Sequence, residues 1–372
     1  MEQLFCPDSR CSNHTPDQAT GWFHQYGSYE SCGETHQRYR CTRCGKTFSR
    51  RTLSIDYWTH RRIDYAQLIT HFASGYSVRG LARYFKTTTQ TIQNRFGRLA
   101  RNSIAAFTSL HHLLTPGEHL VADGLEGFCV SQDFPNNIHL LAGKRSQVVY
   151  GFNYALMRRK GRKTEEQKRR CEQLYPRVDF TTRTIKHTFR ELLVQMMNLA
   201  HRLSGFCLFT DENKHYQFAL REDPFTSRLR VVGGFSHITI NSKAPRTLSN
   251  DLFSVNYLDR EVRKDIPEFH RETVCFPRNV CNSLERLCVY FFHHNYIKRY
   301  RIGVAGEERT HAEVAGVEQE RVALIRREVV TRRSFYHDGS VTYGGFFDEL
   351  WQRVIPTPLK EKPEYLPKYA LA

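Results

Sequence analysis

Two closely spaced pairs of cysteines constrain the start of the chain more tightly than any other feature. Cys41 and Cys44 are separated by two residues, and Gly45 then permits the sharp turn of a metal-binding knuckle. Cys6 and Cys11, with four residues between them, supply a second pair. A segment this short cannot build a large hydrophobic core, so a tetrahedral Zn²⁺ ion held by four thiolates would explain how it folds.

We therefore predict a zinc ribbon over residues 1–52, with Cys32 and His14 as competitors for the fourth ligand position. Ordinary reduced thiols are the alternative interpretation. Cationic side chains surround the second cysteine pair with aromatic residues between them, which favours phosphate contact over a merely solvated face. The DNA-contacting residues predicted in this segment are Arg38, Arg40, Arg43 and Lys46.

The chain as a whole is strongly basic. It has 55 Lys and Arg against 38 Asp and Glu, a formal net charge of +17. This excess favours a polyanionic partner, either nucleic acid or an acidic membrane surface. No apolar run is long enough to span a membrane, and residues 1–10 lack the layout of a signal peptide. We expect a cytoplasmic protein that binds nucleic acid and not a membrane.

Three short helices with tight turns are predicted over residues 60–108. Gly75 ends the first periodic pattern, Ser77 is placed to cap the second helix, and Thr89 lies at the start of the third. This layout is typical of a helix-turn-helix whose third helix enters the major groove, and a plain three-helix packing unit is the alternative. The predicted DNA contacts on the third helix are Gln90, Gln93, Asn94, Arg95 and Arg98.

Short β-type runs alternate with helical stretches in residues 118–330, which indicates an α/β or α+β domain. We expect residues 331–372, which are rich in proline near their end, to form an extended tail packed on the surface.

Two aspartates in this domain each follow an apolar run. Asp123 follows 120–122, and Asp211 follows 206–210. A carboxylate at the end of a buried strand is unfavourable without a partner or a metal. Phosphodiester cleavage and joining use two divalent ions held by carboxylates from separate elements. Both residues are thus candidate ligands of a catalytic metal, and a turn or helix cap is the alternative for either one alone.

Four segments carry a likeness to a known family, and they follow the right order along nearly the whole chain: the Cys-Pro-x-x-x-Cys head, 37–48, 210–216 and 271–276. Together they resemble the bacterial insertion-sequence transposases, most closely the insertion-sequence-one type and its relatives. The resemblance implies a ribonuclease H-like catalytic core with an acidic DDE triad and Mg²⁺ or Mn²⁺ as its metal. It also implies binding to the terminal inverted repeats and to target DNA, at least a homodimer on DNA, and association with the nucleoid.

The resemblance carries the first two acids onto Asp123 and Asp211. The glutamate of the family falls on Asn256, which is not an acid. Asp259 lies three residues later and would project from about the same helical face, so it is the predicted third acid. Glu285 resembles the asparagine-then-glutamate signature of other insertion-sequence families and is the alternative.

Two further features are open to two interpretations each. His237 could hydrogen-bond a phosphate at the cut site or be a satisfied core histidine. The basic run 158–163 could bind DNA or be a solvated loop. For the whole chain, a sequence-specific DNA-binding regulator and a metal-dependent nuclease without joining activity are the alternatives to a transposase.

Overall fold

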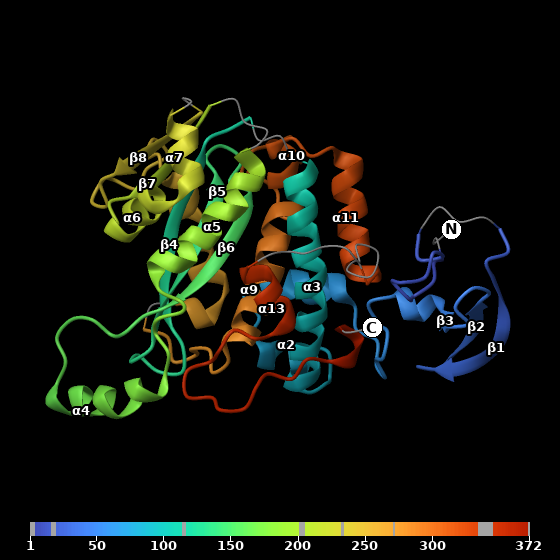
Figure 1. Ribbon diagram of the computed structural model, residues 1–372. Coiled ribbons are helices and arrows are strands. Elements are labelled where there is room, and N and C mark those ends of the chain that lie inside the picture. Colours follow the sequence, from blue (N-terminus) through green and yellow to red (C-terminus); the bar gives the residue numbers. More distant parts are fainter. Residues whose placement is uncertain are drawn as a thin grey trace.

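The computed structural model describes residues 4–15, 20–113, 117–200, 205–231, 234–270, 272–333 and 345–370. It confirms the prediction of a mixed α/β protein, with two separate sheets, of which the larger is flanked by helices (Figure 1). The strands are β1 (Phe23–Ser31), β2 (Glu34–Cys41), β3 (Thr47–Ser49), β4 (Leu120–Phe128), β5 (Pro135–Gly143), β6 (Val149–Leu156), β7 (Phe206–Asp211) and β8 (Phe235–Ile240).

The helices of the described residues lie between and after these strands. They are α1 (Tyr65–Ala73), α2 (Val78–Tyr84), α3 (Thr89–Leu113), α4 (Glu165–Leu174), α5 (Ile185–Ala200), α6 (Lys214–Glu222), α7 (Pro224–Val231), α8 (Phe253–Asp265), α9 (Val280–Tyr296), α10 (His311–Ala315), α11 (Gln319–Thr331) and α13 (Phe346–Gln352).

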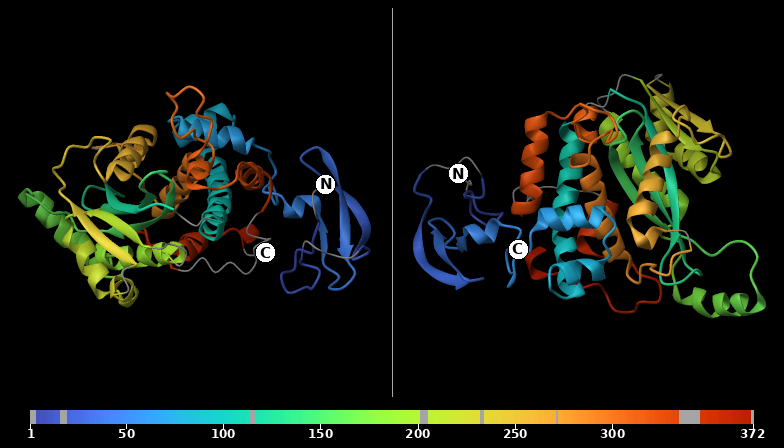
Figure 2. Two further views of the ribbon diagram at one scale, coloured as in Figure 1. Left: turned by 90° about the horizontal axis from the view of Figure 1, so that it is seen from above. Right: turned by 180° about the vertical axis from the view of Figure 1, so that it is seen from behind.

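The N-terminal head is an antiparallel sheet of β1, β2 and β3 that stands apart from the rest of the molecule (Figures 1 and 2). The chain that leaves it is tied to the end of α11. Ser54 forms an isolated antiparallel bridge with Arg332, and the Arg333 amide donates to the Leu53 carbonyl at 2.9 Å. The head is therefore attached to the body through a short, hydrogen-bonded connection.

Helices α1, α2 and α3 follow the head, and the third is much longer than expected. Asp64 caps α1 and Ser77 caps α2, each through a side-chain oxygen. Helix α3, however, runs for 25 residues to Leu113. Its buried positions continue through Ile104 and Phe107, so no polar break ends it where we placed the end of the helix-turn-helix.

The second sheet has five strands in the order β6-β5-β4-β7-β8. Strands β4, β5 and β6 form an antiparallel meander, whereas β7 and β8 run parallel to β4. Helices α5 and α6 cover one face, with His139 of β5 hydrogen-bonded to Thr188 of α5 and Tyr216 of α6. Helix α8 packs on β4 and β5 from the other face.

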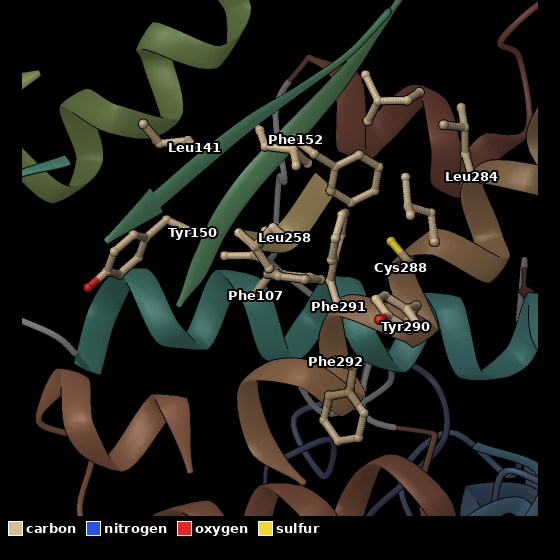
Figure 3. Close-up of a cluster of buried hydrophobic side chains, with 14 of the residues drawn as sticks. Phe107, Leu141, Tyr150, Phe152, Leu258, Leu284, Cys288, Tyr290, Phe291 and Phe292 are labelled. Carbon is tan, nitrogen blue, oxygen red and sulfur yellow. The ribbon is translucent and has the colours of Figure 1, made fainter. Parts of the chain in front are cut away.

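The main core lies between the sheet and the long helices α3 and α9, which pack against each other (Figure 3). Phe152 of β6 packs edge to face with Phe291 of α9 and Phe347 of α13, and Phe107 of α3 stacks on Phe347. The C-terminal half of α3 thus belongs to the core of the second sheet. The described C-terminal part also differs from the expected extended tail, because Phe346 and Phe347 lie on a buried helix.

No helix in the described part of the chain is both long and apolar enough to cross a membrane.

Candidate metal sites and nucleic-acid interface

The four cysteines predicted as zinc ligands gather in the head. The sulfur atoms of Cys6, Cys11, Cys41 and Cys44 all lie within 4.8 Å of one another. The Cys6–Cys44 distance is 3.4 Å and the Cys11–Cys41 distance is 3.9 Å. Four thiolates at about 2.3 Å from a tetrahedral Zn²⁺ lie about 3.8 Å apart, so the cluster is compatible with such an ion and too open for disulfides.

Local backbone structure holds the second pair in place. Cys41 ends β2, and Gly45, with φ of +71°, turns the chain so that its amide donates to the Cys41 carbonyl at 3.0 Å. Burial acts to raise the pKa of Cys41, but the amides of Cys44 and Arg43 and the side chain of Asn13 outweigh it and lower the pKa to about 6. These donors favour the thiolate, which is the form that binds a metal.

The two competing ligands lie outside the cluster of four. The Cys32 sulfur is 3.5 Å from the Thr59 carbonyl, and His14 Nδ1 is 2.7 Å from the Cys6 carbonyl. Both side chains therefore support the surrounding backbone, and the sulfur atoms of the two pairs are sufficient for one tetrahedral site.

The cationic residues of the head differ in exposure. Arg40, Arg43 and Lys46 are exposed, whereas Arg38 is half-buried with its guanidinium 5.3 Å from the Tyr29 ring centroid. Arg40 lies over Tyr26 at the same distance. All four lie on β2 or on the turn that joins it to β3, and the three exposed ones are accessible, as a phosphate-binding role requires.

The predicted contacts on α3 divide into two groups. Gln90 and Asn94 are exposed and hydrogen-bond each other at 2.9 Å. Gln93, Arg95 and Arg98 are buried, which corrects the expectation that they face DNA. Arg95 donates to the Arg61 carbonyl at 2.5 Å and Arg98 to the Ile55 carbonyl at 2.6 Å, so both guanidiniums hold the connection between the head and α1.

Glu285, the alternative third acid, belongs to a buried polar network between α3 and α9. It is 2% exposed, forms an ion pair with Arg353, and accepts a hydrogen bond from Gln93 at 3.0 Å. Arg286 in turn donates to the Gln93 side chain at 2.6 Å and pairs with Glu268. Glu285 thus balances an arginine of the C-terminal segment and contacts α3.

Asp123 and Asp211 lie on neighbouring parallel strands in the middle of the five-stranded sheet. The register pairs Leu120 with Leu208 and Val121 with Phe209. Extending this register by two residues places Asp123 level with Asp211, and residues two apart on a strand share a face. The same face of β4 is covered by α8, which carries Asp259. A glycine is needed directly after Asp123, because a Cβ at Gly124 would lie 2.2 Å from the Asn137 side chain.

The charges of Asp211 and Asp259 both act on Asp123. Burial raises the pKa of Asp123 to about 7, and the negative charges of Asp211 and Asp259 act in the same direction. The Gly124 amide, which donates to Asp123 at 2.7 Å, and the positive charge of Arg246 oppose this rise. Burial also raises the pKa of Asp211. A buried carboxylate group of this kind favours bound protons or a cation.

The carboxylates do not converge as closely as the thiolates. Among the described residues, the four cysteines are the only group of three or more potential ligands close enough together to hold a metal ion. The aspartates instead bind neighbouring donors: Asp211 accepts from the Asn213 amide at 3.0 Å, and Asp259 from Arg263 Nε at 3.3 Å. Asn256 lies one turn before Asp259 on α8 and is half-buried.

His237 lies on the opposite face of the sheet from Asp211. It is level with Leu208 on β7, and its Nε2 is 2.9 Å from the Thr210 hydroxyl. Burial, assisted by the positive charge of Arg230, lowers the pKa of His237 to about 4. The structure therefore favours the satisfied, neutral histidine over a phosphate contact beside the aspartates.

Sequence reasoning missed one residue of this site. Arg246 lies in the exposed loop after β8, and its charge acts on Asp123. A lone arginine in a loop carries no pattern, and its proximity to Asp123 depends on how β7 and β8 are placed beside β4.

Comparisons of the chain with protein families, with curated proteins and with solved structures find no match. The functional conclusion therefore rests on the residues and their geometry.

Proposed function

We propose that this protein is a DNA transposase that binds the terminal inverted repeats of an insertion sequence and cleaves and joins DNA strands with divalent metal ions. The observation that carries the proposal is the parallel register of β4 and β7, which brings Asp123 level with Asp211 when it is extended by two residues, together with the charge of Asp259 acting on Asp123. The first acid is thus on the first strand of the sheet, the second at the end of β7 and the third on the following helix α8. The ribonuclease H-like resemblance implies this same placement.

The donor set fits a hard divalent cation. Carboxylate oxygens are the ligands that Mg²⁺ and Mn²⁺ prefer, and the raised pKa of Asp123 marks a site where a cation would relieve repulsion between carboxylates. Asp123, Asp211 and Asp259 would hold this metal, which supplies stabilisation of phosphate charge and activation of the attacking oxygen. Arg246, whose charge acts on Asp123, would hold a phosphate of the strand being cut.

DNA recognition is assigned to the head and the helix-turn-helix. The zinc-binding cysteines would fix the hairpin that carries Arg40, Arg43 and Lys46. The exposed Gln90 and Asn94 at the start of α3 would contact base edges. Two element ends must be held together for strand joining, so we expect at least a homodimer on DNA.

The proposal is tested with purified protein, Mg²⁺, DNA carrying the inverted repeats that flank its gene, and a supercoiled plasmid. Joined strands support the transposase, nicks alone indicate a nuclease, and binding alone indicates a regulator. Asp123→Asn and Asp211→Asn should abolish joining while leaving DNA binding intact. Glu320→Gln is the control, because Glu320 is an exposed acid on α11, outside the proposed site.

A further inference from the structure

A basic arm projects from the sheet between β6 and α5 (Figure 1). It comprises residues 157–183 and contains α4. Of the residues of α4, only Cys171 is buried, and Leu174 at its end is the one other apolar residue, partly buried against the core. The remaining side chains are polar, so α4 has no continuous apolar stripe and most of its surface faces solvent.

The arm is anchored at its base by one buried carboxylate. Asp133, in the turn between β4 and β5, is fully buried and binds Arg170 at 2.8 Å and Arg159 at 3.5 Å. The Tyr175 hydroxyl donates to the Asp133 carbonyl at 3.1 Å and accepts from the Arg159 amide at 3.0 Å. These contacts join both ends of the arm to the turn that follows β4, so the direction of the arm is fixed relative to the sheet.

The outer part of the arm carries unpaired positive charge. Lys160, Arg162 and Arg169 are exposed, and the described part of the chain offers none of them an ion-pair partner. Lys168, by contrast, pairs with Glu165 at 2.6 Å. Several exposed cations on a protruding, anchored element are complementary to a polyanion. Cationic side chains bind the phosphates of DNA without regard to its base sequence.

The arm begins at the C-terminal end of β6, which lies on the same side of the sheet as the C-terminal ends of β4 and β7. Both β4 and β6 are antiparallel to β5, so their C-terminal ends lie at the same edge, and β7 points the same way. Asp123 lies five residues before the end of β4, a separation of about 17 Å along the strand. One turn of duplex DNA, about 34 Å, is long enough to reach from the aspartates to the base of the arm.

We propose that this arm binds the phosphate backbone of target DNA. The inference rests on the proposed function and adds a second DNA site, away from the zinc-binding head at the opposite side of the molecule (Figures 1 and 2). Target DNA has arbitrary sequence. The element that binds it therefore needs cationic side chains that contact phosphates and not side chains that hydrogen-bond to base edges. The head and α3 would bind the element end, and the arm would hold the DNA that receives it.

The test compares the triple variant Lys160→Gln, Arg162→Gln, Arg169→Gln with the control Arg228→Gln, Arg327→Gln, Lys362→Gln. The control removes three exposed cations from other surfaces. For a short duplex of random sequence, the slope of log binding constant against log salt should become shallower by about 2 to 3 in the arm variant, because each lost phosphate contact contributes about 0.9. A slope equal to that of the control would overturn the proposal.

Strand-transfer assays then identify the DNA that the arm holds. The arm variant should cleave element ends at the wild-type rate and join them to plasmid at least tenfold more slowly. An equal loss of cleavage and joining would overturn the assignment to target DNA and place the arm on the donor flank. A wild-type protein that joins no strands would refute the transposase proposal and with it the target assignment, whereas the salt slope still decides whether the arm binds duplex DNA.

Discussion

The two candidate metal sites are assembled in opposite ways. In the head, each ligand pair comes from one short turn, and four sulfur atoms lie within 4.8 Å of one another. In the five-stranded sheet, Asp123 and Asp211 are 88 positions apart in the sequence, and a helix packed on the same face carries Asp259. Local spacing fixes the first site, whereas strand register and helix packing fix the second. The head should therefore depend on its metal for folding, and the sheet should fold with or without one.

The largest expected effect is the loss of the head on removal of zinc. Cys41→Ser should abolish stoichiometric zinc binding and unfold the head, up to about residue 52, while the body stays folded, because structural zinc contributes about 10–16 kcal/mol to small domains. Metal analysis and limited proteolysis measure both consequences. Cys32→Ser is the matched control and should keep one zinc per chain. Retained zinc in Cys41→Ser would refute the four-cysteine site.

The two candidates for the third acid should differ in their structural roles. Glu285→Ala should lower the free energy of unfolding by about 3–5 kcal/mol, because it leaves Arg353 buried without its ion-pair partner. Asp259→Ala removes a partly exposed ion pair with Arg263 and should change the free energy of unfolding by at most about 1 kcal/mol. Chemical denaturation measures both values. Equal destabilisation would contradict the structural role assigned to Glu285.

Divalent metal should stabilise the sheet without being required for its folding. Mg²⁺ or Mn²⁺ at 100 times its Kd should raise the free energy of unfolding by about 2.7 kcal/mol. Asp123→Asn and Asp211→Asn should remove this gain, and both should be more stable than the wild type without metal, since each removes a repelling charge. Thermal unfolding with and without metal tests this, with Glu320→Gln, an exposed acid on α11, as the control. If Asp211→Asn still gained stability from metal, the assignment of Asp211 as a metal ligand would be wrong.

The sheet should also lose stability in acid through His139. Burial lowers the pKa of His139 to about 3, below the ordinary value near 6.5. Between these two pH values the unfolded chain binds the extra proton, so the free energy of unfolding falls as the pH drops below about 6.5. The contribution is about 2 kcal/mol between pH 7.5 and pH 5. His139→Leu should flatten the measured pH dependence by this amount, whereas the exposed His60→Gln should not.

The contrast between the sites also explains what could be predicted from the sequence. Cysteine spacing identifies the head ligands directly, and apolar runs locate β4 and β7 with an aspartate in or after each. The full length of α3 was missed, because the pattern that defines a helix-turn-helix does not show where packing on α9 extends the helix.

The side chains of α3 show the same limit. Three polar residues of α3 are of the types that contact DNA, but each donates a hydrogen bond to a residue far away in the sequence: Gln93, Arg95 and Arg98. Helical spacing shows which residues share a face, but only the tertiary structure shows whether that face meets solvent or another helix. The same holds for Arg246, whose electrostatic effect on Asp123 depends on the placement of β8.

The continuity of α3 has a consequence for where DNA would be cut. The helix is about 37 Å long; its first turn carries Gln90, and its C-terminal half packs against β6 of the sheet that bears the aspartates. A single rigid helix leaves no hinge between recognition and chemistry. Under the proposed function, the number of base pairs separating the recognised sequence from the broken bond would be a constant of the protein, and inserting one helical turn into α3 would displace the break along the DNA by a defined amount.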